Sequence, residues 1–321
     1  MTTDVAALPA DAWTTGATRV AFHAVPVAAV LATLLVGWYA LAVWLNAPQV
    51  TDRFARDGRD WTVPQLVDAT WSMERPVLPA PHQIAVDFYQ TVFATPIDSK
   101  RSLVYHAGVT VSATLVGFAL GAALGIMLAI GIIHLPVLDR SLLPWIIASQ
   151  TVPILAIAPM VVVVLGNLGF VGLLPKAIIS MYLCFFPVTI GMAKGLRSPD
   201  PLQLDLMRTY SASRAQIFRK LRWPAATGFL FTSLKVAIAA SLIGAIVGEL
   251  PTGAQAGLGA RLLTGSYYGQ TMQIWSALIM ASLVGVILVL AVAAAEKLVM
   301  RMMKKHLIFI MANITKLMRL I

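Results

Sequence analysis

Residues 197–224, RSPDPLQLDLMRTYSASRAQIFRKLRWP, form a polar and basic segment between two long apolar stretches. Asp200 followed by Pro201 is typical of a helix start, because the carboxylate accepts a bond from a free N–H and proline needs no acceptor. Ser213 with Gln216 three residues later has the spacing of a capping box. The segment therefore predicts two short capped helices in an ordered loop, on which another protein can dock.

Proline and basic residues place this loop relative to a membrane. We expect Pro224 to end the second short helix before the next apolar stretch begins, because proline breaks helices. Positive charges favour the cytoplasmic side of a membrane protein. The loop is therefore predicted to be cytoplasmic; its cations are Arg197, Arg208, Arg214, Arg219, Lys220 and Arg222.

The composition is that of an integral membrane protein. The 321 residues are 59% hydrophobic and 12% charged, whereas soluble domains carry about 25% charged residues. The net charge of +10 does not indicate nucleic-acid binding, because the cations flank apolar stretches and are not interleaved with aromatics on a polar domain. Cys184 is the single cysteine, so the chain has neither an internal disulfide nor a cysteine-based metal site.

Six apolar stretches are long enough to cross a bilayer, which takes about 20 residues. The fold class is therefore all-α and integral to the membrane. The first stretch is too long for a cleavable signal peptide and follows a polar leader, residues 1–20. We predict six spans, at 21–45, 104–132, 142–165, 173–195, 228–250 and 272–295.

Lysine and arginine set the orientation, with both termini in the cytoplasm. The external segment 46–101 carries several cations, but long loops weigh little in this rule. We expect 46–101 to be irregular, except for a short interfacial helix from Pro81 to Phe93. Ile84, Phe88 and Val92 would form the apolar face of that helix. Within the cytoplasmic tail, 301–321, residues 307–321 are interpreted as an interfacial helix or as a tail without fixed structure.

Small residues and prolines within the spans suggest how the helices pack. Gly117, Gly121 and Gly125 have the four-residue spacing that lets helices approach closely; internal packing is favoured over a subunit interface. The prolines of the third span, Pro153 among them, predict a broken helix, which is either the wall of a pathway or a structural kink. Lys235 is expected to extend its ammonium group back to the cytoplasmic face.

The candidate residues of a translocation path are polar groups or helix breaks near the third and fifth spans. Alternatives remain for two of them: Asn167 is interpreted also as a turn residue, and Glu249 also as a headgroup-level residue paired with Arg261. The candidates are Gln150, Thr151, Pro153, Asn167 and Glu249.

Motifs for catalysis and metal binding are missing from the sequence. It has no G-x-x-x-x-G-K-[ST] loop for phosphates, no G-x-S-x-G elbow and no H-E-x-x-H motif. His106 and His134 have no partner at ligand spacing, so no metal site is predicted. The chain is not expected to be an enzyme, and ATP would have to be bound by another subunit.

The loop at 197–224 resembles the coupling loop of ABC importer permeases, whose pattern is E-A-A, three residues, G, nine residues, I-x-L-P. Asp205-Leu206-Met207 stand at the E-A-A positions, Ser211 at the glycine, and Leu221, Trp223 and Pro224 at the I-x-L-P positions. Residues 149–160, SQTVPILAIAPM, resemble the third-span signature of the nitrate/sulfonate/taurine branch. Gly257-Leu-Gly259 resembles the outer loop of that branch.

This resemblance covers residues 102–300 and implies a type I importer permease core with coupling helices between spans 4 and 5. It implies a bacterial inner-membrane location, a second permease subunit, identical or homologous, and an extracytoplasmic substrate-binding protein. Two ATP-binding subunits would hold ATP and Mg, and this chain itself would hold no cofactor. The residues implied in ATPase coupling are Asp205, Leu206, Met207, Tyr210, Ser211 and Arg214; those implied in binding-protein docking are Gly257, Gly259 and Arg261.

Three questions stay open at this stage. Leu206, Met207 and Ser211 depart from the alanine and glycine of the pattern, which suggests a heterodimer as readily as a homodimer. A stand-alone secondary transporter or channel is the alternative function, although it would need ionisable residues deep in the membrane. The resemblance implies a small polar solute, namely an anion, a sulfonate or a pyrimidine-like heterocycle; residues 248–259 suggest the heterocycle.

Overall fold

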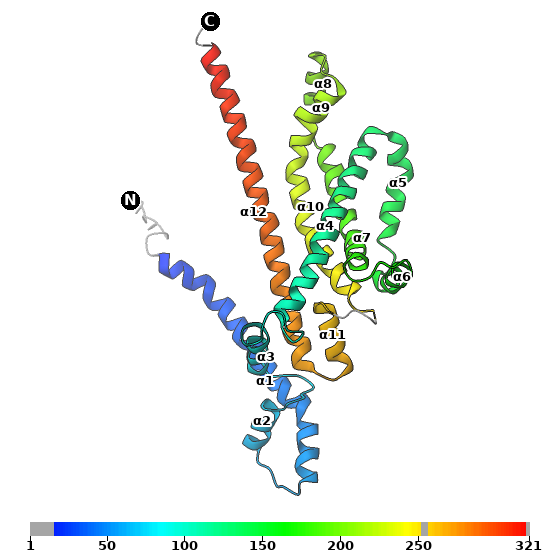
Figure 1. Ribbon diagram of the computed structural model, residues 1–321. Coiled ribbons are helices and arrows are strands. Elements are labelled where there is room, and N and C mark those ends of the chain that lie inside the picture. Colours follow the sequence, from blue (N-terminus) through cyan, green and yellow to red (C-terminus); the bar gives the residue numbers. More distant parts are fainter. Residues whose placement is uncertain (1–15, 252–255, 319–321) are drawn as a thin grey trace, which may run out of the picture. The chain divides into compact units, whose positions relative to one another are not determined.

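The structure, a computed structural model, describes residues 16–251 and 256–318, with side chains from 25 to 251 and from 256 to 304. All regular elements in these ranges are helices (Figure 1). The chain divides into two units after Asp87. The first unit holds α1 (Gly16–Arg56), α2 (Val63–Trp71) and most of α3 (Pro81–Tyr89). The second holds η1 (Gln90–Ala94), α4 (Leu103–His134), α5 (Pro136–Ser149), α6 (Ile154–Asn167), α7 (Leu173–Leu196), α8 (Pro201–Thr209), α9 (Arg214–Ile217), η2 (Phe218–Arg222), α10 (Trp223–Gly248), α11 (Leu258–Tyr267) and α12 (Thr271–Met318).

In the first unit, the long helix α1 continues past the predicted end of the first span. It runs to Arg56, so the expectation that the chain becomes irregular after residue 45 is wrong. The buried Asn46 explains the extension, because its side chain accepts from the N–H of Val77 at 2.8 Å and donates to the Leu78 carbonyl at 2.9 Å. A returning segment thus packs along α1, and Trp71 of α2 meets Tyr39 edge-on with 5.2 Å between ring centroids.

The helix predicted from Pro81 to Phe93 is confirmed, as α3 followed by the π-helical turn η1. Its apolar face packs at least partly on protein, and its interfacial placement stays a prediction. Ile84 is buried, and Phe88 and Val92 pack against a core cluster that includes Leu103 of α4. This packing against other residues of the protein accounts for the apolar face.

Three helices, α4, α7 and α10, form the core of the second unit. A Cβ added at Gly117 of α4 would overlap Ser180 of α7, and one added at Gly121 would lie 2.7 Å from the Cβ of Cys184. Gly125 meets Val188 in the same way. The three glycines therefore serve internal packing, as favoured from the sequence, because the absence of side chains lets two helix backbones touch.

Glycines also allow α7 and α10 to pack closely. Gly244 and Gly248 of α10 lie against the α7 backbone at Ser180 and Lys176. Buried hydroxyl groups add hydrogen bonds across the helices: Ser180 donates to the Ser241 carbonyl at 2.6 Å, and Ser241 donates to the Thr114 carbonyl of α4 at 2.9 Å. Such bonds satisfy polar groups that would be costly to leave unpaired in a membrane.

The break predicted in the third span, 142–165, is confirmed. The chain forms α5 and α6, which meet at 97° around a break of four residues. Each helix has 14 residues, about 21 Å, which is shorter than the ~30 Å bilayer core. Pro153 lacks an N–H and stands directly before α6, and the Tyr182 hydroxyl donates to the Ser149 carbonyl that the break exposes.

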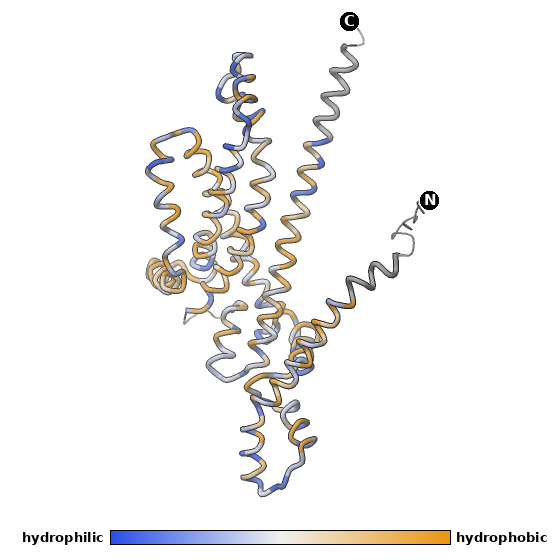
Figure 2. The backbone as a smooth tube through the Cα atoms, turned by 180° about the vertical axis from the view of Figure 1, so that it is seen from behind, coloured by the Kyte–Doolittle hydropathy of each residue, from blue (hydrophilic) through white to orange (hydrophobic). Residues whose placement is uncertain are grey.

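The described residues contain five helices long and apolar enough to cross a membrane, or six if α5 and α6 together count as one span. Figure 2 shows the apolar character along these helices and the hydrophilic stretch at α8 and α9. The last span was predicted to end at 295, but α12 has 48 residues and continues to Met318. A helix of about 72 Å is much longer than the membrane core; the interfacial position predicted for 307–321 depends on side chains outside the described ones.

The helix that follows α8 is continuous with the next span, so the prediction that Pro224 separates them is wrong. Residues Arg214–Gly248 form one helical stretch of 35 residues. The π-helical turn η2 lies directly before Pro224, with the Trp223 N–H bonded to the Phe218 carbonyl five residues earlier. This turn shifts the bonding pattern where proline has no N–H to donate, so the helix continues.

Candidate functional sites

The coupling loop, residues 197–224, is a capped helical pair at one end of the second unit, the end at which α4 turns into α5 (Figure 1). The Asp200 side chain accepts from the Leu202 N–H at 2.8 Å. Ser213 and Gln216 exchange both bonds of a capping box, at 2.8 and 3.3 Å. Both predicted caps are confirmed.

The turn between α8 and α9 contains a strained residue. Ser211 has a φ of 51°, and it is the one non-glycine residue with positive φ among those described. Its N–H bonds to the Arg208 carbonyl, and the Ala212 N–H bonds to the Met207 carbonyl, at 2.8 and 2.9 Å. This is a Schellman motif, in which glycine is the favoured residue. The sequence pattern, which has glycine at this position, agrees with the geometry.

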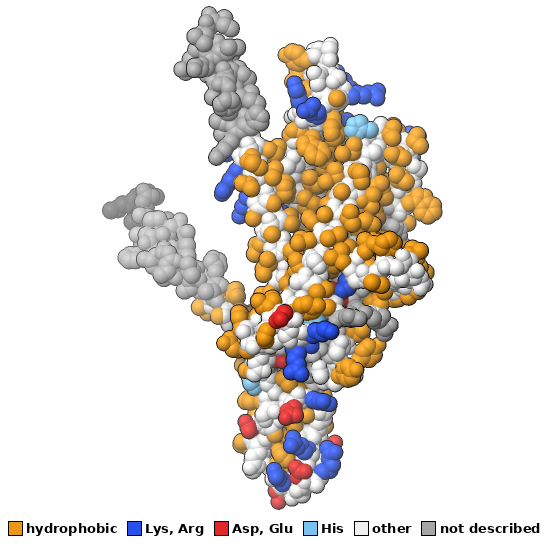
Figure 3. All heavy atoms as spheres, viewed as in Figure 1, with side chains coloured by type: hydrophobic (Ala, Val, Ile, Leu, Met, Phe, Trp, Pro, Cys, Tyr) orange, Lys and Arg blue, Asp and Glu red, His pale blue; other side chains and the backbone are white. Residues whose placement is uncertain are grey.

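An apolar stripe lies exposed on α8. Leu202, Leu206 and Tyr210 follow at four-residue spacing on one helical face and are 77%, 57% and 78% exposed. Figure 3 shows apolar and basic side chains side by side at this end of the protein. An apolar patch with a charged rim is typical of a protein-interaction surface. Leu202 belongs to it although the family pattern did not identify it; its four-residue spacing from Leu206 is the signal.

The remaining predicted coupling residues surround this stripe. Met207 is half-buried, and Ser211 and Arg214 are exposed. Asp205 forms an exposed ion pair with Arg208 at 2.9 Å. The structure therefore brings Asp205, Leu206, Met207, Tyr210, Ser211 and Arg214 together in one exposed loop.

A buried carboxylate site lies at the opposite end of α10. The Glu249 side chain is 0% exposed and forms an ion pair with Lys176 of α7, with 3.4 Å between Nζ and Oε1. Thr110 of α4 donates its hydroxyl to the same carboxylate at 2.9 Å, and the Gly259 N–H donates at 2.9 Å. Four helices, α4, α7, α10 and α11, thus meet at one negative charge.

His106 extends this site. Its Nδ1 accepts from the Gly257 N–H at 3.0 Å, while its Nε2 faces the Lys100 carbonyl at 3.0 Å. Because the first bond requires a lone pair and the second requires a proton, the imidazole is neutral with its proton on Nε2. Thr110 also accepts from the Leu258 N–H at 2.8 Å, so the start of α11 is held by side chains of α4 and α10.

The structure corrects two predictions at this site. Glu249 is enclosed by protein and bound to Lys176, rather than lying in the headgroup region. Gly257 and Gly259 are buried, so they cannot themselves form a docking surface. They are small because a Cβ at either position would meet Glu249, and Gly257 has a φ of +128°. Docking by Arg261, which is half-buried, stays a prediction.

A second ion pair lies within the membrane-spanning helices. Lys235 of α10 bonds to Glu296 of α12 at 2.9 Å. The ammonium group of Lys235 thus has a carboxylate partner on α12, and its extension toward the cytoplasmic face stays a prediction. The sequence did not predict Glu296 as the partner, because Glu296 lies beyond the predicted end of the last span at residue 295, whereas α12 continues through it.

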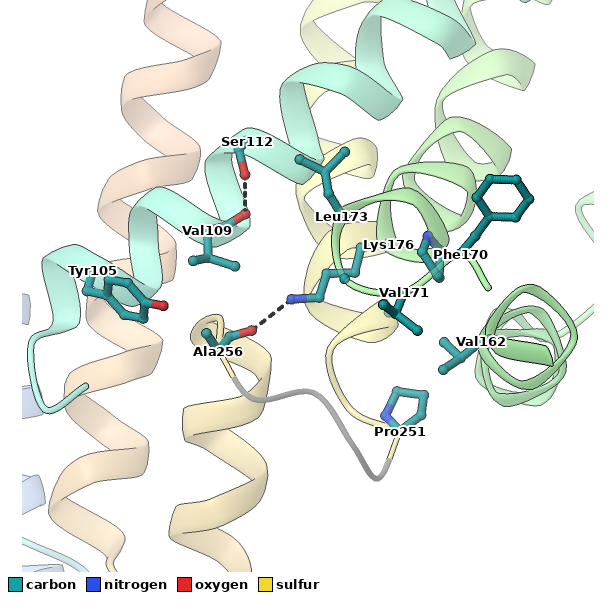
Figure 4. A pocket seen from close by; sticks show the side chains of 14 residues that line it. Tyr105, Val109, Ser112, Val162, Phe170, Val171, Leu173, Lys176, Pro251 and Ala256 are labelled. Carbon is teal, nitrogen blue, oxygen red and sulfur yellow. Dashed lines mark hydrogen bonds between the residues drawn. The ribbon is translucent and has the colours of Figure 1, made fainter. Parts of the chain in front are cut away.

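The α6 pocket is a cavity of about 660 Å³ near the buried carboxylate site (Figure 4). Tyr105, Val109 and Ser112 of α4 form one side, and the turn from α6 to α7 forms the other. Lys176 lines it but directs its ammonium group to the Ala256 carbonyl, at 2.8 Å, and to Glu249. The remaining lining residues are Val162, Gly166, Phe170, Val171, Gly172, Leu173, Pro175, Gly248, Pro251 and Ala256.

The predicted path residues are only partly gathered near this pocket. Gln150, Thr151 and Pro153 lie exposed at the break between α5 and α6, and Asn167 is exposed at the end of α6. None of the four lines the α6 pocket, and their part in a path stays a prediction. Groups of three or more possible metal ligands do not occur in the part of the chain that the structure describes.

These features describe a multi-pass membrane protein with an exposed, capped helical loop at residues 197–224. Residues 121–305 match the sequence profile of the family described as binding-protein-dependent transport system inner membrane component. The chain belongs to this family, so it is a type I permease component of an ABC importer for a small solute, as the coupling-loop resemblance implied.

Several curated relatives are permeases. The chain is 30% identical over 233 residues to the formylaminopyrimidine transport permease protein ThiX of Halalkalibacterium halodurans, covering 72% of this chain and 87% of that protein. It is 29% identical to the riboflavin transport system permease protein RibX of Chloroflexus aurantiacus, covering 70% and 80%. It is 24% identical to the putative aliphatic sulfonates transport permease protein SsuC of Bacillus subtilis, covering 75% and 87%. The predicted nitrate/sulfonate-like branch is consistent with these relatives.

Proposed function

We propose that this chain couples to a cytosolic ATP-binding subunit through the stripe of Leu202, Leu206 and Tyr210 on α8. Their exposure carries the proposal, because three large apolar side chains in water on one short helix have a cost that a partner's groove removes. ATP and Mg are bound by that partner. The assembly has two such subunits, a second permease subunit, identical or homologous, and an external binding protein.

The orientation that fits this coupling places the loop in the cytoplasm of a bacterium and the chain in its inner membrane. Cations gather at the loop, as expected for a cytoplasmic segment. If α5 and α6 together make one crossing, the chain crosses six times and both termini are cytoplasmic. Glu249, the α6 pocket and α11 then lie toward the external face, where a binding protein delivers its solute.

The solute is a small uncharged heterocycle of the pyrimidine kind. Relatives named for formylaminopyrimidine and riboflavin support this class. The α6 pocket supports it too: Tyr105 and Phe170 offer aromatic surface, and the charge of Lys176 is already balanced by Glu249. An anion such as a sulfonate would enter without a free counter-charge among the described lining residues, and burying a charge without a partner is costly.

Native mass spectrometry of the tagged chain, co-expressed with its chromosomal neighbours and gently extracted, tests the coupling proposal. We expect a complex with two ATP-binding subunits and two permease subunits, whose masses distinguish a homodimer from a heterodimer. A lone chain or a simple homo-oligomer, found repeatedly without an ATP-binding subunit, would contradict the proposal and favour a stand-alone transporter or channel.

A further inference from the structure

A groove distinct from the α6 pocket lies between α5, α7 and α10, at the end that carries the coupling loop. It has a volume of about 450 Å³. Leu143 of α5, Ile190 and Ala193 of α7 and Phe229 of α10 line its apolar part. Lys194, Arg197 and Ser198, from the last turn of α7 onward, line its polar part. None of these residues belongs to the coupling stripe or to the buried carboxylate site.

The groove has a polarity gradient along α7. Arg197 and Ser198 stand at the end of the helix, where the chain leaves the apolar stretch, and Ile190 lies about two turns deeper. A ligand that fills the groove therefore meets positive charge at one end and aliphatic or aromatic surface at the other. Membrane phospholipids have this same arrangement of polar headgroup and acyl chain, and they surround the helices.

The charges at the polar end leave an excess of one positive charge. Arg197 bonds to Asp139 of α5 at 2.7 Å, so those two charges compensate each other. Lys194 is exposed and forms no ion pair with any residue that the structure describes. The α7 carboxyl end disfavours an anion slightly; Lys194 and the remaining guanidinium N–H groups of Arg197 outweigh this.

We propose that this groove binds an anionic phospholipid, with the headgroup phosphate at Lys194 and Arg197 and an acyl chain along Ile190, Leu143 and Phe229. Basic pockets between membrane helices at the cytoplasmic side are known to bind anionic headgroups. A bound lipid would join α5 to the packed core at a place where the protein alone leaves a gap. The site would make anionic lipid a structural component of the permease beside its coupling loop.

The test uses the full-length chain in nanodiscs of phosphatidylcholine with a fixed fraction of phosphatidylglycerol. Native mass spectrometry after release into detergent measures how much of each lipid stays bound. We expect the wild-type chain to retain phosphatidylglycerol over phosphatidylcholine, and Lys194→Gln to reduce this retention about fivefold, the usual effect of one cation near a lipid headgroup. Arg140→Gln, which changes an exposed cation of α5 outside the groove, is the matched control and leaves retention unchanged.

A second variant gives a change in the opposite direction. Asp139→Asn frees Arg197 from its partner and is expected to raise phosphatidylglycerol retention about fivefold. Inorganic phosphate at about 10 mM, a large excess over the protein, should not displace the lipid. Equal retention by wild type and Lys194→Gln, lowered retention by a folded Asp139→Asn variant, or displacement by inorganic phosphate would each overturn the proposal, the last in favour of a site for small anions.

Discussion

Lys176 of α7 and Glu249 at the end of α10 form an ion pair of 3.4 Å inside the protein, with their side chains 8% and 0% exposed. The carboxylate also accepts from Thr110 and from the Gly259 N–H. Burying two charges is costly, and this arrangement is acceptable only because each is surrounded by further hydrogen bonds. The pair therefore ties the start of α11 to three helices of the core.

Removing one charge of this pair should be much worse than removing both. Glu249→Gln leaves the ammonium group of Lys176 buried without its counter-charge, and we expect a loss of about 3–5 kcal/mol in the free energy of unfolding. The double variant Glu249→Gln with Lys176→Met should recover part of that loss. Thermal and denaturant unfolding in detergent measure both. Additive losses in the double variant would show that the pair has no coupling energy.

Two glycines of α4 provide a comparison within one helix. Gly121→Ala would place a Cβ 2.7 Å from the Cβ of Cys184 and 2.9 Å from the Met181 carbonyl oxygen, so α4 must move away from α7. We expect a loss of about 1–3 kcal/mol from overpacking. Gly108→Ala meets nothing within 4 Å and should gain about 0.5–1 kcal/mol, because alanine favours helix over glycine. Unfolding curves of the two variants that shift in the same direction would contradict the packing described for α4.

Ser211 offers a stabilising substitution. Its φ of 51° costs a non-glycine residue about 1 kcal/mol or more, so Ser211→Gly should stabilise the turn between α8 and α9. Hydrogen exchange at the amides of Ser211 and Ala212, both bonded to α8 carbonyls, is expected to slow about fivefold. Ser211→Val should have the reverse effect, because a β-branched residue is strained at positive φ. Unchanged exchange in both would exclude a left-handed residue here.

The exposed stripe of α8 can be tested by introducing glutamine at two positions, one within the stripe and one on the opposite face of the helix. Leu206→Gln removes an anchor of the stripe, whereas Arg208→Gln changes the opposite face of the helix. We expect the Leu206 variant to lower the solute-stimulated ATPase activity of the assembled complex about tenfold or more, the size of an effect at an interface anchor. The Arg208 variant should stay close to wild type, since its exposed ion pair contributes little. Equal activities would mean that the docking face lies elsewhere.

The helical fold and the capped loop could be predicted from the sequence because both depend on local patterns. Apolar length identifies a span wherever it lies, and Asp200 and Ser213 each act on N–H groups two or three residues away. The four-residue spacing of Gly117, Gly121 and Gly125 likewise predicted close packing, although only the structure identifies α7 as the partner.

The errors arose where a distant or non-standard interaction decides the outcome. Pro224 was expected to stop a helix, but a π-helical turn accommodates it. Lys176 lies 73 positions from Glu249, and Lys235 lies 61 from Glu296, so neither pair follows from spacing. The buried role of Gly257 and Gly259 depends on the carboxylate beneath them, which no local pattern contains.

The uninterrupted helix from Arg214 to Gly248 connects the coupling loop to the buried carboxylate site. Its 35 residues extend about 52 Å, with the coupling loop at one end and Glu249 immediately after the other. A tilt of only about 5° at the loop would displace the far end by about 4–5 Å, as the length of the rod requires. Because Glu249 accepts a hydrogen bond from the Gly259 N–H at the start of α11, such a tilt would also displace the start of α11.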